Sequence, residues 1–235
     1  MEGMWTRFFP AVEKLTELVN AGLLGDVVAL HSDFGFNSTD VADYPSHQMY
    51  SHRLGGGGLY YLGPYPVAAA VHAFGASPPA RTAVVGVRDD ATGVDMAAAA
   101  SGGGGVRRRG VAALTYNMMG ESPEETVVIG TRGRVRILNP AHCPMALEVH
   151  RKREGRGNVE RELLEFPLPP PPAAVVVTGG FNYPNSEGFA FEARAIHRCV
   201  RAGLTHCPQY PPEEVLAVAH ILDDMRRQIG LEPVP

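Results

Sequence analysis

The sequence lacks the features that place many chains in a class at once. With 21 Lys and Arg against 25 Asp and Glu, its net charge is −4, so it has no basic field for nucleic acid. No apolar run approaches the length of about 20 residues that a membrane span needs. The start of the chain has neither the basic nor the apolar region of a signal peptide. We therefore expect no nucleic-acid partner, no membrane and a cytoplasmic location.

Cysteine is scarce as well. The three cysteines, Cys143, Cys199 and Cys207, are scattered and show no paired spacing, which argues against a disulfide framework and favours a reducing compartment. Nine histidines are present, but their spacing from these cysteines matches no zinc site. We expect no metal.

A dinucleotide-binding fingerprint is also missing. Neither glycine run fits the pattern Gly-x-Gly-x-x-Gly after a hydrophobic strand, and the first part of the chain shows no strand–helix–strand alternation. We expect the N-terminal Rossmann domain to be absent. Hydride chemistry would then need a cofactor domain that this chain does not contain.

The composition suits a single domain with a substantial core, since 45% of the 235 residues are hydrophobic. Periodic apolar stripes predict helices at residues 11–21, 59–74, 189–201 and about 213–229. Pro64 and Pro66 confine the regular part of the second helix to the residues after them. Segments rich in β-branched residues predict strands at 27–36, 81–88, 94–100, 110–117, 125–130, 134–138, 147–151 and 163–166.

The last six of these strands form three predicted hairpins, and Arg107, Arg108 and Arg109 lie at the tip of the first as a solvated basic run. We predict an α+β fold, a mainly antiparallel open sheet with helices on one face. The single domain 1–235 divides into a connecting helix region (1–26), a sheet with a central helix (27–166), a Pro-rich and aromatic loop (167–188) and C-terminal helices (189–235).

The glycine-rich stretch 54–67 is the most distinctive part of the chain. Its four consecutive glycines allow tight turns, and the helix after them can aim Tyr60, Tyr61 and Tyr65 into a cleft. The simpler interpretation is a surface loop followed by a helix that packs on the core.

The same stretch resembles the helix-opening motif of the glucose–fructose oxidoreductase / inositol dehydrogenase / MocA (Gfo/Idh/MocA) family. That motif runs Gly-Gly-x-x-x-Asp-x-Gly-x-His or Tyr, and here Tyr65 takes the last position while Tyr61 takes the place of Asp. Further motifs match in order along the chain: Gly22-x-x-Gly25-Asp26, Phe34-Gly35, Gly130-Thr131-x-Gly133, Asn139-Pro140-x-x-Cys143-Pro144, Glu192-Ala193 and Cys199-x-Arg201-x-Gly203.

The resemblance implies the C-terminal domain of an NADP-dependent oxidoreductase, from the branch that oxidises secondary alcohols of trans-dihydrodiols or D-xylose. It implies Tyr65 as the proton-transferring residue and a homo-oligomer that forms through the sheet face. By motif position an aromatic substrate pocket would use Trp5, Phe34, His142 and Tyr183. The family's catalytic Lys, in a Glu-Lys-Pro motif, lies upstream of the segment matched by residues 2–10, so we expect a truncated chain that is inactive alone.

Tyr65 can act as a proton-transferring residue only if a neighbouring group lowers its pKa. A phenol has an ordinary pKa of about 10 and needs a nearby cation to bring it toward neutral pH. The Lys is absent here and Tyr61 replaces the carboxylate. A rival interpretation is therefore a non-catalytic interaction protein that pairs through its sheet face, and a third is a sugar-binding module without chemistry. For Trp5 and Phe34 the alternative to a substrate contact is core packing.

Overall fold

Alternating apolar and polar residues build a long sheet at the centre of the molecule. The computed structural model describes the whole chain except residues 104–109, 154–157, 174–175, 177–179, 182 and 232–235. In it, segments with period-two burial form strands, because successive side chains of a strand point to opposite faces. The strands are β1 (Val27–Gly35), β2 (Arg81–Arg88), β3 (Asp95–Gly103), β4 (Val111–Asn117), β5 (Thr126–Gly130), β6 (Gly133–Ile137), β7 (Ala146–Lys152) and β8 (Val159–Glu165).

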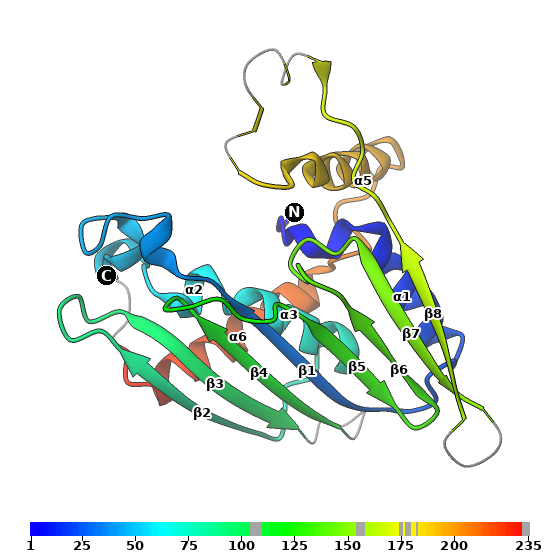
Figure 1. The fold of residues 1–235 in the computed structure, drawn as a ribbon, viewed down its shortest axis with the longest axis horizontal. Helices are drawn as coiled ribbons and strands as arrows, with labels where there is room; N and C mark the ends of the chain where they lie inside the picture. The colour runs from blue at the N-terminus through cyan, green and yellow to red at the C-terminus, as the bar shows by residue number, and fades with distance from the viewer. Residues whose placement is uncertain (104–109, 154–157, 174–175, 177–179, 182, 232–235) are drawn as a thin grey trace.

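These strands form one sheet in the order β2-β3-β4-β1-β5-β6-β7-β8 (Figure 1). Neighbouring strands pair antiparallel except β1 and β4, which run parallel with Phe34 opposite Tyr116. The first strand of the chain thus lies in the middle of the sheet, between two hairpin-connected groups.

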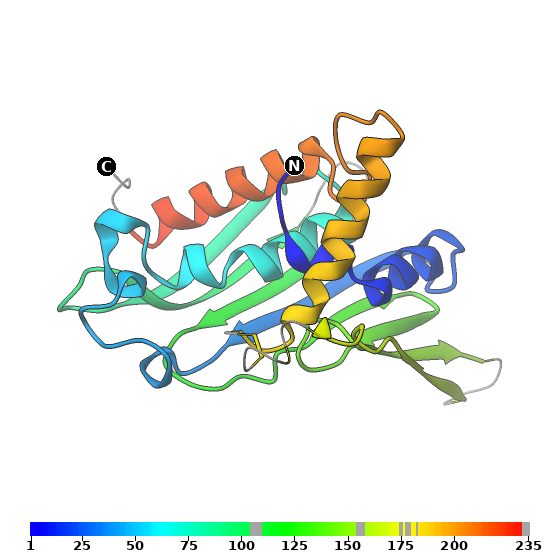
Figure 2. The same cartoon turned by 90° about the horizontal axis from the view of Figure 1, so that it is seen from above.

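The helices lie on one face of this sheet. Figure 2 shows α1 (Pro10–Asn20), α3 (Pro64–Phe74) and α6 (Pro212–Gln228) along that face, while α5 (Phe189–Arg201) crosses the N-terminal turn η1 (Trp5–Phe8). Short helical turns fill the connections: α2 (Gly58–Tyr61), η2 (Ser38–Asp40), η3 (Gln48–Tyr50), η4 (His52–Leu54) and η5 (Ser186–Gly188). Within the described residues, no helix has the length and apolarity to cross a membrane.

The core lies between the helices and the sheet. Leu30 of β1, Leu147 of β7 and Val67 of α3 are fully buried there. On the opposite, open face, no described helix covers the sheet, and Val85 and Val111 are 70% and 57% exposed. The sheet therefore buries one face and exposes the other.

The predicted fold class is confirmed, since a mostly antiparallel sheet carries its helices on one face. All eight predicted strands and four predicted helices form within a few residues of the expected bounds. Pro64 does begin the regular helix α3, and the residues before it form the separate turn α2. The predicted hairpin tip at Arg107 to Arg109 lies outside the described residues.

Candidate active site

The glycine run places Tyr65 by letting the backbone pass close to strand β3. Gly57 has φ +111°, and a Cβ there would lie 2.4 Å from Oδ1 of Asp95. Asp95 is fully buried and accepts a hydrogen bond of 2.7 Å from the Leu59 backbone N–H. This contact ties α2 to β3, and Pro64 then begins α3 with Tyr65 in its first turn.

Burial raises the pKa of Asp95, and the hydrogen bond from Leu59 only partly offsets this effect. Tyr116 lies beneath Gly58, where a Cβ would be 2.7 Å from the phenol ring. Burial, followed by the nearby Asp95 charge, raises the Tyr116 pKa far above its ordinary value. Gly57 and Gly58 are thus required by the buried groups under them, which explains these two positions without any ligand.

Tyr65 belongs to a continuous aromatic cluster that contains the five side chains expected at the site. The Phe34 ring packs against both Tyr65 and His142, with its centroid 5.0 Å from that of Tyr65 and 4.3 Å from that of His142. The Trp5 ring extends the cluster: its centroid lies 6.3 Å from the ring centroids of both His142 and Tyr183. The structure therefore brings these residues together although the chain separates them by up to 178 positions, from Trp5 to Tyr183.

A cavity of about 80 Å³ opens beside this cluster, between α1, α3 and the strands β1 and β5. Tyr65, Phe34 and His142 line it, whereas Trp5 packs behind its wall and Tyr183 lies at the surface with 51% exposure. Tyr60 and Tyr61 are not among its lining residues. Of the three tyrosines expected at a cleft, Tyr65 alone lines this cavity.

Two contributors were missed by sequence reasoning. Phe189, at the start of α5, stacks on Trp5 at 4.9 Å. Arg7 is a buried cation that lines the cavity, pairs with Glu214 of α6 and donates a hydrogen bond of 2.6 Å to the Gln209 carbonyl. The sequence shows Arg7 only as a single charged residue between Trp5 and Phe8. Its partners, Gln209 and Glu214, lie about 200 residues further along the chain, and no local pattern identifies them.

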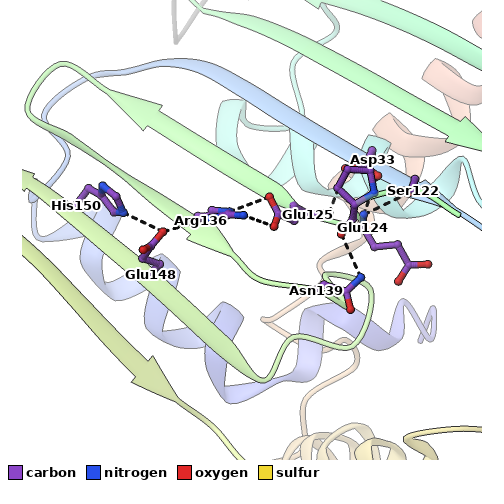
Figure 3. Close-up of polar contacts among 9 residues, drawn as sticks. Asp33, Ser122, Glu124, Glu125, Arg136, Asn139, Glu148 and His150 are labelled. Atoms are coloured by element: carbon purple, nitrogen blue, oxygen red, sulfur yellow. Dashed lines mark hydrogen bonds and ion pairs between the residues drawn. The ribbon is translucent and has the colours of Figure 1, made fainter.

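Polar side chains next to the site hold the loop before β5. Both carboxylate oxygens of Asp33 accept backbone N–H groups there, from Glu124 at 2.8 Å and from Glu125 at 3.1 Å. Figure 3 shows that the Glu124 and Glu125 side chains then extend in opposite directions. Glu125 pairs with Arg136 on the open face, whereas Glu124 faces the aromatic cluster, with Oε2 3.5 Å from His142 Nδ1.

Among the residues that the structure describes, the Tyr65 phenol has no free cation beside it of the kind it would need to ionise near neutral pH. The chain has two lysines, Lys14 and Lys152, and neither lines the cavity, while Arg7 is engaged by Glu214. Burial, with small additions from Tyr183 and Cys143, raises the pKa of Tyr65 to about 12. In this chain Tyr65 therefore keeps its proton at neutral pH.

We expect the absorbance of tyrosinate to show this directly. Subtracting the alkaline titration of Tyr65→Phe from that of the native chain should leave one phenol with a midpoint near pH 12. Since the folded-state pKa exceeds the unfolded value of about 10, stability from the neutral phenol is present below about pH 10 and lost as the pH rises toward 12. A difference titration centred at or below pH 10 would show that Tyr65 is not buried as described.

Comparisons with known proteins agree with this architecture. The family model of the GFO/IDH/MocA C-terminal domain matches residues 12–136. Similar curated proteins include trans-1,2-dihydrobenzene-1,2-diol dehydrogenases of Bos taurus, 33% identical over 231 residues, and of Homo sapiens, 32% identical over 231 residues. Each alignment covers 98% of this chain and 62% of the relative, so the chain spans less than two thirds of these proteins.

Solved structures with the same fold include two with small-molecule ligands. One is KijD10, a 3-ketoreductase from Actinomadura kijaniata in complex with NADP and TDP-benzene, with TM-score 0.70, 20% identity and coverage of 97% of this chain and 62% of that one. Another is levoglucosan dehydrogenase in complex with NADH and levoglucosan, with TM-score 0.77, 14% identity and coverage of 97% and 63%. At these identities the two structures establish the fold.

Proposed function

This chain belongs to the Gfo/Idh/MocA oxidoreductase family, and from that premise we propose that residues 1–235 form the substrate-binding and oligomerisation domain of an NADP-dependent dehydrogenase. Its substrates would be secondary alcohols of the trans-dihydrodiol or D-xylose type, as the similar diol dehydrogenases suggest. The observation that carries the proposal is the single aromatic cluster of Tyr65, Phe34, His142, Trp5 and Tyr183 beside a cavity.

The cluster suits a ring-shaped substrate that carries hydroxyl groups. Indole and phenyl rings pack on the apolar faces of a sugar or arene. Phe34, Tyr65 and His142 line the cavity and could make these contacts, whereas Trp5 is buried next to them and would support their rings. Tyr65, which lines the cavity, would transfer the proton of the substrate hydroxyl. For each residue this role is our proposal.

The nicotinamide cofactor would supply the hydride acceptor. No dinucleotide fingerprint occurs in residues 1–235, and the described residues offer no phosphate-binding glycine loop at the head of a βαβ unit. The chain's own contribution is therefore on the substrate side: to bind and orient the alcohol and to move its proton.

All three cysteines are buried free thiols, which supports the proposed cytoplasmic location.

The test joins a cofactor domain of a diol dehydrogenase relative to the N-terminus of the full chain. The fusion should oxidise D-xylose or a cyclic trans-diol with NADP, whereas the chain without that domain should bind neither NADP nor NAD in a calorimetric titration. A properly folded fusion that binds NADP and oxidises neither substrate would contradict the proposed function.

A second candidate is a non-catalytic protein that pairs through its sheet face. Tyr61 favours it, because the family motif has a carboxylate at that position. The open face favours pairing under either candidate: the register places Val85 beside Ala99, and Val85 and Val87 are 70% and 53% exposed. Activity of the fusion would decide between the two candidates.

We expect the chain to self-associate through this open face. Sedimentation at micromolar concentration should show a species heavier than 25.2 kDa. Val85→Lys, which places a charge among the exposed apolar side chains of β2 on the open face, should shift the protein toward the monomer. Leu216→Lys, at a 59% exposed position on α6, is the matched control and should leave association unchanged. A monomeric native chain would contradict the expectation.

A further inference from the structure

We propose that His142 is a further proton-transferring residue of this site: it takes the proton that leaves the substrate through Tyr65, and Glu124 stabilises the resulting imidazolium. The inference rests on the proposed function and deepens it, because it adds a proton acceptor for the same alcohol. In the family motif this position holds an aromatic residue, and an imidazole adds proton exchange to the aromatic role.

Burial and contacts place His142 inside the cluster. Its side chain is 12% exposed, stacks on Phe34 at 4.3 Å and lies 6.0 Å from Tyr65, centroid to centroid, at 78°. Its backbone carbonyl accepts the hydroxyl of Thr6, which fixes the loop between β6 and β7 to the N-terminal turn η1. His142 also lines the cavity with Tyr65. Both groups therefore face the space in which an alcohol would bind.

The charge contact with Glu124 is the second observation. Nδ1 lies 3.5 Å from Glu124 Oε2, which is too long for a well-formed hydrogen bond, and Nδ1 has no other described partner. Such a contact gains energy mainly when the imidazole is protonated. Since both side chains are only 12% exposed, water screens the contact weakly.

Glu124 is held in this position by the backbone around it. It has φ +51°, a left-handed conformation that a residue with a side chain rarely adopts. Asp33 accepts its N–H at 2.8 Å, and its carbonyl accepts the Ala141 N–H at 2.9 Å. Strained residues persist where surrounding contacts over-determine them, and they cluster at functional sites. The Ala141 contact joins Glu124 directly to the residue before His142.

The proton step balances without a free phenolate. The O–H bond of the alcohol breaks and its proton goes to the Tyr65 oxygen, while the Tyr65 proton passes to the imidazole through one water in the cavity that both residues line. The phenol is regenerated, the imidazole becomes a cation beside Glu124, and the electron pair left on the alcohol oxygen forms the carbonyl as hydride leaves the carbon. Because burial holds the Tyr65 pKa at about 12, a relay that avoids phenolate suits this site.

The sole tryptophan provides a readout in the chain alone. Trp5 lies 6.3 Å from His142, and a protonated imidazole quenches indole fluorescence. Other titratable or charged groups face His142 or its cavity: Arg7, Asp33, Tyr65, His72, Glu124, Cys143, Tyr183 and Glu187. The variant His142→Gln separates the titration of His142 from theirs, because a transition due to another group would persist in it. Lowering the pH through the imidazole transition should therefore quench Trp5.

The experiment compares four chains by fluorescence titration between about pH 5 and about pH 9. Glu124→Gln, which keeps the shape and removes the charge, should lower the midpoint of the fluorescence transition, because the imidazolium then loses its neighbouring negative charge. His142→Gln should remove the transition. Glu148→Gln is the matched control: it removes a carboxylate 2.9 Å from another buried histidine, His150, and should leave the Trp5 midpoint unchanged. An unchanged midpoint in Glu124→Gln overturns the inference, even if His142→Gln fails to fold.

The fusion enzyme separates the inference from the proposed function. Glu124→Gln should move the acidic limb of the pH profile of kcat/KM down by the same shift as the fluorescence midpoint. If the fusion is active and neither Glu124→Gln nor His142→Gln changes its pH profile, the proposed role of His142 is wrong while the proposed function stands. A fusion that binds NADP and oxidises no alcohol overturns the proposed function and the proton relay with it.

Discussion

Tyr65→Phe in the active fusion should slow the oxidation of D-xylose and of a cyclic trans-diol by a factor of about 10² to 10⁴. This loss corresponds to roughly 3 to 5 kcal/mol of barrier, because the hydroxyl that passes the substrate proton is gone. The effect should fall mainly on kcat, since the phenyl ring keeps its edge contact with Phe34 at the same place. Steady-state kinetics with both substrates measure it.

Tyr60→Phe is the matched control for this substitution. Tyr60 belongs to α2, the short helix that precedes α3, but it does not line the cavity. Removing its hydroxyl should leave the rate within a few-fold of the parent fusion. If Tyr65→Phe behaves like Tyr60→Phe on both substrates, Tyr65 is a packing residue and our assignment of the proton-transferring group is wrong.

Much of the fold can be predicted from local patterns. Period-two alternation and turn residues identify the strands on either side of Thr131 and Arg132, and proline marks the starts of α3 and α6. The position of β1 cannot be predicted from such patterns. It lies between β4 and β5, because the chain returns to it after passing through α3, β2 and β3. That arrangement depends on long-range pairing, which hairpin signals cannot reveal.

The candidate site shows the same division between local and long-range information. Motif position was enough to select Trp5, Phe34, Tyr65, His142 and Tyr183, and their rings do form one cluster. Their roles stay predictions. The charges around the cluster were beyond sequence reasoning, because each depends on a partner that is distant in the chain or on a backbone conformation, as the contact between Glu124 and His142 illustrates.

Packing explains most of the glycine run, which the sequence identified as a junction that aims tyrosines into a cleft. Gly56 lies against the Met49 carbonyl, where a Cβ would come within 2.6 Å. Gly57 and Gly58 lie over Asp95 and Tyr116. The run therefore acts on the site indirectly, by fixing the approach of α2 to β3 and hence the start of α3 at Tyr65.

This packing predicts that Gly57→Ala is the more damaging of two matched substitutions in the run. Gly57 has φ +111° and ψ 159°, a region open essentially to glycine alone, and the new methyl group would lie 2.4 Å from the buried Asp95 carboxylate. Backbone strain and the displaced carboxylate together should lower the free energy of unfolding by about 3 kcal/mol or more. Urea denaturation of the full chain measures this change.

Gly55→Ala supplies the control, because Gly55 has φ +72° in the ordinary left-handed region and no atom lies within 4 Å of the added methyl group. It should lower the free energy of unfolding by only about 1 to 2 kcal/mol, the usual penalty of that conformation for a residue with a side chain. The difference between the two variants contains the contact with Asp95 and the greater backbone strain at Gly57. Adding Asp95→Ala to Gly57→Ala should restore part of the lost free energy of unfolding, because the methyl group of residue 57 then no longer clashes with a carboxylate. If Gly57→Ala and Gly55→Ala destabilise the chain equally, the close approach of Gly57 to Asp95 does not constrain the start of α2 as described.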